Sequence, residues 1–572
     1  MTVTHEASGE GRQEWFLLAF LVLLALDPAF ARPALAQVMA PGTKCDGTAG
    51  DTASLIYANA TAGARTVYLP PGTCRITSNL TLTATLRFDG DTRLSIDRGV
   101  TVTIRGDLVA PLRRIFSGAG AVAFDNSYVV PVLHPEWWGA VRDGATDDSA
   151  AIQATVNAVS AGQVIELHTG VYAVGTALSI DRSLTLRGRN RVSSELRWTG
   201  RGGTLLTITA TTDNVRLEEF QFNNTGTGAV GIEILGSHVL VAGLRTNPVV
   251  KWSTAAIRTN TTSAIFDVTL RDVQIKSRAA GQENAVGVQF SAGNKFTCDA
   301  CYLSGNLKGV VVGVSGQVVS DFHLVNSLIE TFAGQSTAYP GGAAALGIEL
   351  VSVAGAHIAG NHFEICADQR AVCATNKAIA LHSVGGAMIT GNWFSGSGQA
   401  TTLISAESSA ANDVVVQGNY TERIAGASGY LVTVQSAAVG AVVRIGPNGR
   451  NRTNVAGLLN PTNAYTEVPL AHGASISVDA SQGNVGGNTP FVITVTNGAP
   501  FTIGAPANPT KGQMITFRIR NTWGAMGAVT WAAGYKLGAW TNPAHGNSRS
   551  ITFACDGTNW IEVSRTTADV PN

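Results

Sequence analysis

Asp147 and Asp148 form the only Asp-Asp pair in the chain, in the stretch EWWGAVRDGATDDSAAI. Neighbouring carboxylates can form an acid/base pair, bind a metal ion or mark the start of a helix. One face of a helix over the next residues would carry Ile152, Val156 and Val159. Because Thr146 or Asp147 suits the N-cap of that helix, the pair is predicted to be structural.

A second pair of carboxylates, Glu330 and Glu364, ends the similar segments HLVNSLIE and HIAGNHFE. If these segments lie on consecutive turns of a coil, the two side chains are about 5 Å apart, which suits a retaining glycosidase. The glutamates are therefore the predicted catalytic pair. A protonated His362 would keep Glu364 ionised, which makes Glu330 the predicted acid and Glu364 the nucleophile or base. The alternative is a solvated acidic column.

Aromatic side chains are predicted beside these acids, two residues earlier in each turn, namely Tyr302, His362, Trp393 and Tyr420. Aromatic faces bind the apolar C–H faces of sugar rings. We assign these four residues and Glu422 to substrate binding. The alternatives are packing under the loops at residues 331–346 and 366–377, or a subunit contact. Arg245 and Lys276 are expected in the column of the acids, where they bind a uronate or keep the surface soluble.

Cysteine spacing suggests disulfides rather than a metal site. Cys45 with Cys74, and Cys366 with Cys373, are plausible pairs. Cys298 and Cys301 have the spacing of a redox motif, but no second Cys or His pair accompanies them, so buried thiols or a disulfide are favoured over zinc. Neither a metal nor a cofactor is expected.

Short repeated strands must position the candidate site. Residues 69–90 repeat at 167–188 without a gap, and shorter units follow from Gly203 onward. Such repeats predict an all-β parallel solenoid, with Asn361, Asn392 and Asn419 in one column at a bend. Two inward stacks are predicted: Leu217, Leu270, Leu324, Ile358, Ile389 and Val416 form one, and Phe222, Ile275, Ile329, Phe363 and Phe394 form the other.

The ends of the chain differ from the coil. Residues 16–26 (FLLAFLVLLAL) are apolar but too short to span a bilayer, and a small-x-small signal follows, so residues 1–36 are predicted to be a secretory signal peptide. We divide the rest into a β-rich head (37–135), the β-helix (136–445), a linker (446–463) and a C-terminal antiparallel β-sandwich or jelly roll (464–572).

The chain of 572 residues has zero formal net charge, and only 14% of its residues are charged. We therefore expect no nucleic-acid partner. The short apolar run and the predicted signal peptide lead us to expect no membrane span and a secreted or cell-envelope protein.

The stretch EWWGAVRDGATDDSAAIQATVNAVSAGQVIELHTGVYAV resembles the opening module of the pectate-lyase superfamily. The resemblance implies a right-handed parallel β-helix with an N-terminal capping helix, as in phage tailspike-like polysaccharide depolymerases. It covers only this module, which is structural in that family. The family's motifs Asn-Thr-Asp, Gly-His-Gly, Arg-x-Lys, Arg-x-Pro-x-x-Arg and Tyr-Gly…Asp-Pro are absent after the signal peptide, so no catalytic residue carries over.

The C-terminal module resembles modules of phage tail and particle proteins, for which trimerisation, attachment and carbohydrate binding are all open roles. A homotrimer is therefore one expected assembly. Two functions stay open: a secreted depolymerase, either a hydrolase or a lyase, acting on an extracellular polysaccharide, and a non-enzymatic tailspike-like protein that binds glycans or builds an appendage.

Overall fold

The structure is a computed structural model. It describes residues 37–39, 42–62, 66–125, 128–246, 250–259, 262–277, 284–331, 345–365, 376–396, 402–408, 410–421, 430–434, 443–445, 448, 467–480, 486–507, 509 and 511–572. The predicted signal peptide, the second Cys pair and the predicted linker apart from Asn448 lie outside these residues. Within them, no helix combines the length and the apolar character that crossing a membrane requires.

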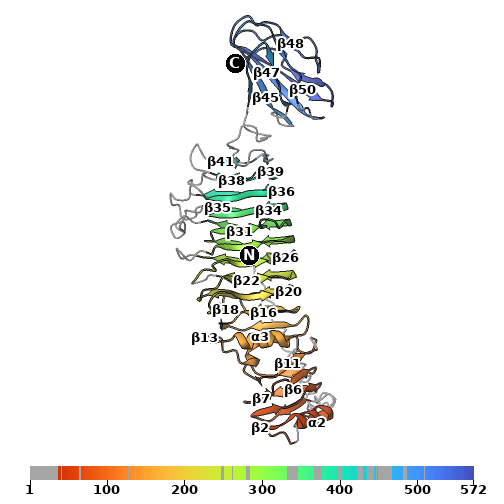
Figure 1. The fold of residues 1–572 in the computed structure, drawn as a ribbon, viewed down its shortest axis with the longest axis vertical. Helices are drawn as coiled ribbons and strands as arrows, with labels where there is room; N and C mark the ends of the chain where they lie inside the picture. Colours follow the sequence, from red (N-terminus) through yellow and green to blue (C-terminus); the bar gives the residue numbers. More distant parts are fainter. Residues whose placement is uncertain are drawn as a thin grey trace, which may run out of the picture. The chain divides into compact units, whose positions relative to one another are not determined.

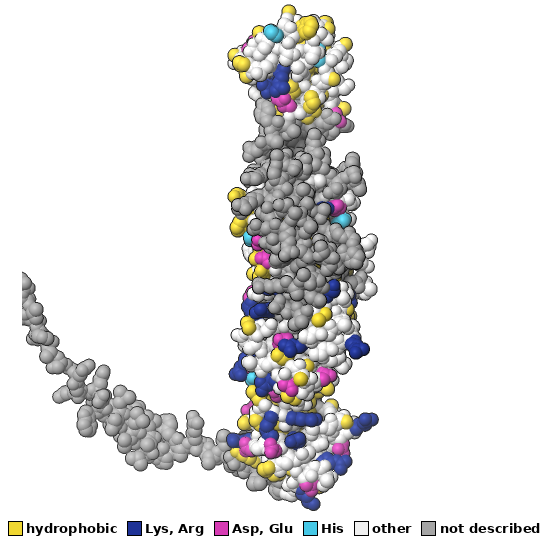
Figure 2. Space-filling model, turned by 90° about the vertical axis from the view of Figure 1, so that its left-hand side faces the viewer, with side chains coloured by type: hydrophobic (Ala, Val, Ile, Leu, Met, Phe, Trp, Pro, Cys, Tyr) yellow, Lys and Arg dark blue, Asp and Glu magenta, His cyan; other side chains and the backbone are white. Residues whose placement is uncertain are grey.

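The described chain forms two compact units. The first contains the residues up to Val141 and Ala150–Glu166, and the second contains Arg142–Ser149 and Leu167–Asn572. On the face drawn in Figure 2, acidic and basic side chains are interspersed over the first unit. Many of them form pairs on the surface, such as Arg75 with Asp97 at 2.9 Å.

The first unit is a short coil with three parallel sheets. One sheet contains β1 (Gln37–Met39), β3 (Thr66–Leu69), β6 (Thr85–Phe88) and β9 (Leu108–Val109). The second contains β2 (Asp46–Gly50), β4 (Thr73–Ile76), β7 (Arg93–Ile96) and β10 (Phe116–Gly118), and the third contains β5 (Leu80–Leu82), β8 (Thr101–Ile104) and β11 (Ala121–Phe124). Helix α2 (Thr52–Ala62), β12 (Val132–Leu133) and the 3-10 helix η2 (Pro135–Trp138) complete the described elements up to Val141. A disulfide joins Cys45 and Cys74, which confirms this predicted pair.

The predicted internal repeat is present and begins earlier than expected. Strands β3 to β6 recur as β14 (Val164–Leu167), β15 (Gly170–Val174), β16 (Leu178–Ile180) and β17 (Thr185–Gly188). In each copy, an Asp-Gly strand and a helix precede them: β2 and α2 in the first copy, and β13 (Asp143–Asp147) and α3 (Ser149–Ala158) in the second.

The acids of this repeated segment accept backbone hydrogen bonds. Asp51 and Asp148 are both 1% exposed. The Asp51 carboxylate accepts hydrogen bonds from the backbone N–H groups of Lys44, Cys45 and Arg75. The Asp148 carboxylate accepts one from the backbone N–H of Arg142 at 3.0 Å. Because equivalent aspartates bind backbone amides in both copies, Asp148 has a structural role.

Asp147 lies at the start of the predicted helix. Its Oδ1 accepts the N–H and the hydroxyl of Ser149, the first residue of α3, and the N–H of Gly175 at 3.2 Å. Burial raises the pKa of Asp147, but these hydrogen bonds outweigh it and the pKa is lowered overall. The carboxylate therefore connects the helix start to Gly175, the residue that follows β15.

The second unit contains a parallel β-helix (Figure 1). Its eleven-stranded sheet consists of β13, β15, β18 (Ser194–Trp198), β21 (Gln221–Asn224), β24 (Arg245–Thr246), β27 (Gln274–Lys276), β30 (Tyr302–Ser304), β33 (Leu328–Glu330), β35 (His362–Ile365), β37 (Trp393–Gly396) and β40 (Tyr420–Thr421).

The other coil strands belong to one twenty-stranded sheet, in which each strand pairs with its equivalents one coil away. Beside β12, β14, β16 and β17 it contains β19 (Thr204–Ile208), β20 (Asp213–Glu218), β22 (Val230–Ile234), β23 (Ser237–Ala242), β25 (Ala255–Thr259), β26 (Ile265–Arg271), β28 (Val286–Phe290), β29 (Gly293–Asp299), β31 (Lys308–Val312), β32 (Val319–Val325), β34 (Leu346–Ala359), β36 (Lys377–Thr390), β38 (Thr402–Ala406), β39 (Ala411–Gln417), β41 (Tyr430–Val434) and β42 (Val443–Ile445).

Both predicted inward stacks are confirmed. The first consists of Leu217, Val241, Leu270, Cys298, Leu324, Ile358, Ile389 and Val416, in direct register and buried. The second contains Phe222, Ile275, Leu303, Ile329, Phe363 and Phe394, which are also buried. Alternation of apolar and polar residues brings one face of each strand to this core. Cys298 is bonded to Cys301.

The predicted asparagine column is a hydrogen-bonded ladder. Asn361 Nδ2 donates to Asn392 Oδ1 at 2.9 Å, and Asn392 Nδ2 donates to Asn419 Oδ1 at 2.9 Å. Asn419 continues the ladder to Asn448 at 3.0 Å, which was not predicted. Each Oδ1 also accepts the backbone N–H of the preceding asparagine. The ladder therefore satisfies buried amides at a bend, as polar groups away from water require.

Two further columns consist of residues with positive φ. The turn column contains Glu219, Gly243, Asp272, Ala300, Asn326, Gly360, Gly391 and Gly418. The strand column contains Asn214, His238, Asp267, Lys295, Asp321, Gly355, Gly386 and Asp413. This conformation costs L-residues about 1–2 kcal/mol each, and Gly, Asn and Asp tolerate it best. It recurs because each coil must follow the backbone of the coil before it.

The C-terminal residues form two sheets, but the predicted antiparallel topology is wrong for most pairings. The seven-stranded sheet contains β43 (Val468–Leu470), β45 (Gly486–Val495), β47 (Met514–Asn521), β49 (Tyr535–Lys536), β50 (Asn547–Cys555), β51 (Trp560–Arg565) and β52 (Val570–Pro571). The three-stranded sheet contains β44 (Ser475–Ile476), β46 (Phe501–Ile503) and β48 (Val529–Trp531).

The chain alternates between these two sheets from β43 to β48. A strand and its next partner in the same sheet are therefore separated by a crossover, and they run parallel. Antiparallel pairing is confined to β50 with β47, β51 and β52. Apolar alternation predicted the strands, but it does not distinguish the two directions of pairing.

We predict that Asn392→Ala destabilises the coil. The change removes the acceptor of the Asn361 amide and the donor to the Ile358 carbonyl. A buried group left without a partner costs about 1–3 kcal/mol. Thermal unfolding followed by circular dichroism should show a lower midpoint. Asn412→Ala, at an exposed position on β39, is the control; equal midpoints for the two variants would contradict a stabilising ladder.

We also predict that Asp147→Ala lowers the free energy of unfolding by about 0.5–2 kcal/mol, as the loss of a helix cap does. Because the Asp147 carboxylate binds Ser149 and a backbone N–H within the described part of the chain, any enzymatic activity should be unchanged per folded molecule. Denaturant titration and an activity assay on the same preparation check this. Lost turnover at an unchanged melting temperature would assign Asp147 to chemistry instead.

Candidate active site

The acid pair, Glu330 and Glu364, lies on neighbouring strands of the eleven-stranded sheet. Strands β33 and β35 pair in parallel, with Glu330 directly opposite Glu364. The preceding residues, Ile329 and Phe363, are buried, so the alternation of each strand directs the glutamates outward. Paired positions in a sheet lie about 4.8 Å apart. The structure therefore brings the two predicted catalytic residues together.

The two carboxyl groups have different surroundings. Burial raises the pKa of Glu364, and the negative charge of Glu330 raises it further. The hydroxyl of Tyr302 donates a hydrogen bond to Glu330 Oε2 at 2.8 Å. Glu364 therefore keeps its proton to a higher pH than an ordinary glutamate does.

The raised pKa of Glu364 is opposite to the expectation from the sequence that Glu364 stays ionised, which had made Glu330 the predicted acid. The expectation relied on a charged His362 beside Glu364. In the structure, His362 Nε2 is bonded to Ser395 Oγ at 2.6 Å, and burial dominates at Glu364. Neither the burial nor the Tyr302 hydroxyl can be read from one strand, because both depend on neighbouring coils.

Three of the four predicted aromatic residues lie together. His362, Trp393 and Tyr420 are consecutive partners in register, one per coil. The rings of His362 and Trp393 are stacked, with centroids 4.1 Å apart and 7° between their planes. Trp393 remains 43% exposed and Tyr420 60% exposed. Trp393 and Tyr420 therefore offer exposed aromatic surface, while His362 and Trp393 cover part of each other.

Tyr302 is separated from the other aromatic residues by Leu328, its partner in the next coil. Its ring contacts Lys276, whose Nζ is 4.1 Å from the ring centroid. Lys276 covers one face of the Tyr302 ring, and the Tyr302 hydroxyl binds Glu330. Tyr302 is therefore suited to position the Glu330 carboxylate rather than to stack on a sugar. The i, i+2 spacing and adjacent coils could have indicated this contact.

The expected position of Arg245 is wrong. Arg245 pairs with Gln221 and Gln274, so it belongs to the aromatic column and not to the column of the acids. A shift of two residues preserves the inward and outward alternation, so apolar pattern alone does not detect it. Lys276 is in the predicted column, one coil from Ser304 and two from Glu330. Glu422 lies outside the described residues.

Comparisons with known proteins find likeness in structure only. No protein-family model and no curated protein matches the chain. ORF18 of Geobacillus virus E2 aligns with a TM-score of 0.42 and 12% identity, over 77% of each chain. The gp42 tailspike of Acinetobacter phage vb_AbaP_AS12 has a TM-score of 0.36 and 11% identity, over 77% of this chain and 82% of the other.

An alginate lyase from Paenibacillus sp. str. FPU-7 aligns with a TM-score of 0.34 and 14% identity, over 55% of this chain and 95% of the lyase. Likeness at these values carries no argument about activity. The parallel β-helix, of the kind that the resemblance to the pectate-lyase superfamily implied, is established by the stacked parallel sheets of the chain itself.

The raised pKa of Glu364 predicts a pH-dependent gain in stability for Glu364→Gln. Between the unfolded-state pKa near 4.5 and the higher folded-state pKa, the folded protein binds more protons than the unfolded chain. Stability therefore falls as pH rises through this window, and the neutral amide removes that loss. The melting temperature of the variant should exceed that of the parent at pH 7 but not at pH 3.5.

Scanning calorimetry at the two pH values measures this difference. Glu218→Gln, on the twenty-stranded sheet, controls for the general effect of removing a carboxylate from the coil. A shift of equal size at both pH values would show that the Glu364 carboxyl is not perturbed by its surroundings.

Proposed function

We propose that the coil cleaves an extracellular or cell-surface polysaccharide at the acid pair, with Glu364 as general acid and Glu330 as nucleophile or base. The observation that carries this proposal is the direct pairing of two outward glutamates of which one has a raised pKa. Paired acids with different proton affinities are what hydrolysis of a glycosidic bond requires.

Each carboxyl group has a role that its contacts support. Glu364, protonated more readily, would donate a proton to the oxygen of the leaving sugar. Glu330 would act as a carboxylate on the anomeric carbon or on water, and the Tyr302 hydroxyl stabilises that charge. The strand spacing of about 4.8 Å is close to the separation of about 5–5.5 Å at which the second group acts as nucleophile.

The exposed aromatic residues suggest how the glycan lies. Trp393 and Tyr420 are in the first and second coils after Glu364, and they are part of the same outward surface. A polysaccharide along the coil axis would therefore meet the acid pair and then these rings. Aromatic surface binds the C–H faces of sugars, so these residues would hold the chain beside the acids.

Secretion and the homotrimer remain predictions that belong to this proposal. The other candidate, a protein that binds a glycan without cleaving it, needs the exposed Trp393 and Tyr420 but not the acid pair. The experiment must therefore measure binding and cleavage separately.

We predict that Glu330→Gln and Glu364→Gln each lower the cleavage rate by several orders of magnitude, and that the double variant loses little more. Both changes keep the side-chain volume and remove the ionisable group, and residues that act as a unit are not additive. Reducing ends released from a panel of bacterial and plant polysaccharides measure hydrolysis, and absorbance of unsaturated uronates detects a lyase.

Glu218→Gln should cleave like the parent, because its strand β20 belongs to the other sheet. Trp393→Ala should weaken glycan binding while the melting temperature is unchanged. Full activity in both Gln variants would remove the acid pair from the mechanism. Binding without any cleavage by the parent would favour the glycan-binding protein.

A further inference from the structure

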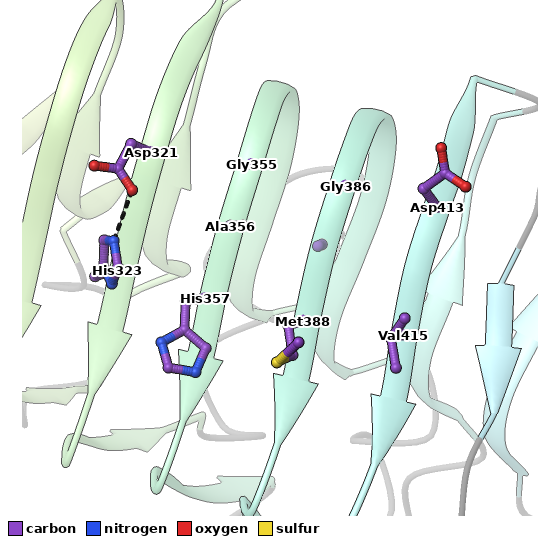
Figure 3. A pocket seen from close by; sticks show the side chains of 10 residues that line it. Asp321, His323, Gly355, Ala356, His357, Gly386, Met388, Asp413 and Val415 are labelled. Atoms are coloured by element: carbon purple, nitrogen blue, oxygen red, sulfur yellow. Dashed lines mark hydrogen bonds and ion pairs between the residues drawn. The ribbon is translucent and has the colours of Figure 1, made fainter.

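A groove lies on the twenty-stranded sheet, away from the sheet that carries the acid pair. It has a volume of about 360 Å³ and crosses β32, β34, β36 and β39 (Figure 3). Its lining combines Asp321, His323, Gly355, Ala356, His357, Gly386, Ala387, Met388, Asp413 and Val415. Two imidazoles and a thioether side by side are a combination that the proposed function does not use.

The strand column explains why the surface is hollow here. Asp321, Gly355, Gly386 and Asp413 are its last four members, with positive φ. The two glycines have no side chain, whereas the aspartates at each end project outward (Figure 3). The groove is therefore a recess between two carboxylates, two coils wide.

The possible metal ligands occupy one outward row of this recess. His323 pairs with His357, and His357 pairs with Met388, in the parallel register of β32, β34 and β36. His357 has no hydrogen-bond partner within the part of the chain that the structure describes. Met388 is 45% exposed. A free imidazole and an exposed thioether are thus adjacent, with a second imidazole beside them.

The two rings have a separation that suits a shared ion. Their centroids are 5.7 Å apart, and the planes are nearly perpendicular. Nitrogen binds a metal at about 2.0–2.1 Å, so two imidazoles on one trigonal or tetrahedral ion have centroids about 5–6 Å apart. Rotation of the rings about their side-chain bonds would direct one nitrogen of each to the same point.

Asp321 supplies the carboxylate that such a site needs. Its Oδ1 is 2.7 Å from His323 Nε2. Histidines that bind metals commonly donate the other ring N–H to a carboxylate, which fixes the ring and its tautomer. With Nε2 as the donor, His323 Nδ1 carries the lone pair, and Figure 3 shows this nitrogen on the side away from Asp321.

We propose that His323, His357 and Met388 bind a soft transition-metal ion, for which Cu(I) is the best match, with Asp321 orienting His323. Imidazole alone would suit several ions, but Zn(II) is bound in proteins by Cys, His and carboxylate groups, whereas the soft thioether of Met suits Cu(I). The site is on a different sheet from the acid pair and does not depend on the proposed glycan cleavage.

The test is an anaerobic titration of the full chain with Cu(I) in competition with bicinchoninate. The parent should bind one ion in this row, and His357→Ala should remove it. Met388→Leu keeps the apolar volume and removes only the sulfur, so it should weaken Cu(I) binding and leave Zn(II) binding unchanged. Asp321→Asn should lower the affinity by about 10–100-fold, as the loss of an orienting carboxylate does.

His238→Ala is the matched control. His238 also pairs with an aspartate, Asp213 at 2.6 Å, on the same sheet, but its neighbours in the strand column are Asn214 and Asp267. Its replacement should leave Cu(I) binding unchanged. Melting temperatures establish that each variant is folded. The proposal is overturned if the parent binds no Cu(I), or if His357→Ala and Met388→Leu both bind as the parent does.

Discussion

In-register parallel pairing of each coil with the next is the constraint on which the rest of the structure depends. Every strand of the coil must present its residues opposite those of the coil before it, about 4.8 Å away. An apolar position therefore becomes a buried stack, as from Leu217 to Val416. Polar residues that repeat at a buried bend form a hydrogen-bonded ladder. The side-chain amides of Asn361, Asn392 and Asn419 can bond to one another only when the coils are aligned. The same pairing sets the acid pair side by side.

Much of this arrangement can be predicted from sequence because it rests on alternation. The inward stacks and the asparagine column follow from residues that recur at equal offsets within similar segments. Alternation has a period of two, however, and it says nothing about shifts of two residues or about strand direction. Arg245 was misplaced for the first reason, and the strands from β43 to β48 were expected to be antiparallel for the second.

The chemistry of the candidate site was less predictable than its location. The residues of the acid pair could be chosen from two similar segments, but the raised pKa of Glu364 depends on burial and on the charge of Glu330 in the neighbouring coil, and the Tyr302 hydroxyl that binds Glu330 comes from another coil. His362 illustrates the difficulty, because it is bonded to Ser395 on the next strand, a contact that its own segment does not reveal. The groove of His323, His357 and Met388 was missed altogether, since its members are neighbours only through the pairing of β32, β34 and β36.

In the strand column, the backbone conformation stays the same from coil to coil while the shape of the surface changes. Its backbone conformation recurs in the coils from Asn214 to Asp413, but the side chain does not: Asp321 and Asp413 occupy it, and so do Gly355 and Gly386. Exchanging Asp for Gly between coils would move a recess along the axis while the path of the main chain stays the same. Coils with the same backbone can thereby differ in surface shape. The positive-φ position accepts either Asp, whose side chain fills space, or Gly, which leaves the space open. The shape of the surface can therefore differ from coil to coil while the packing of the core stays the same.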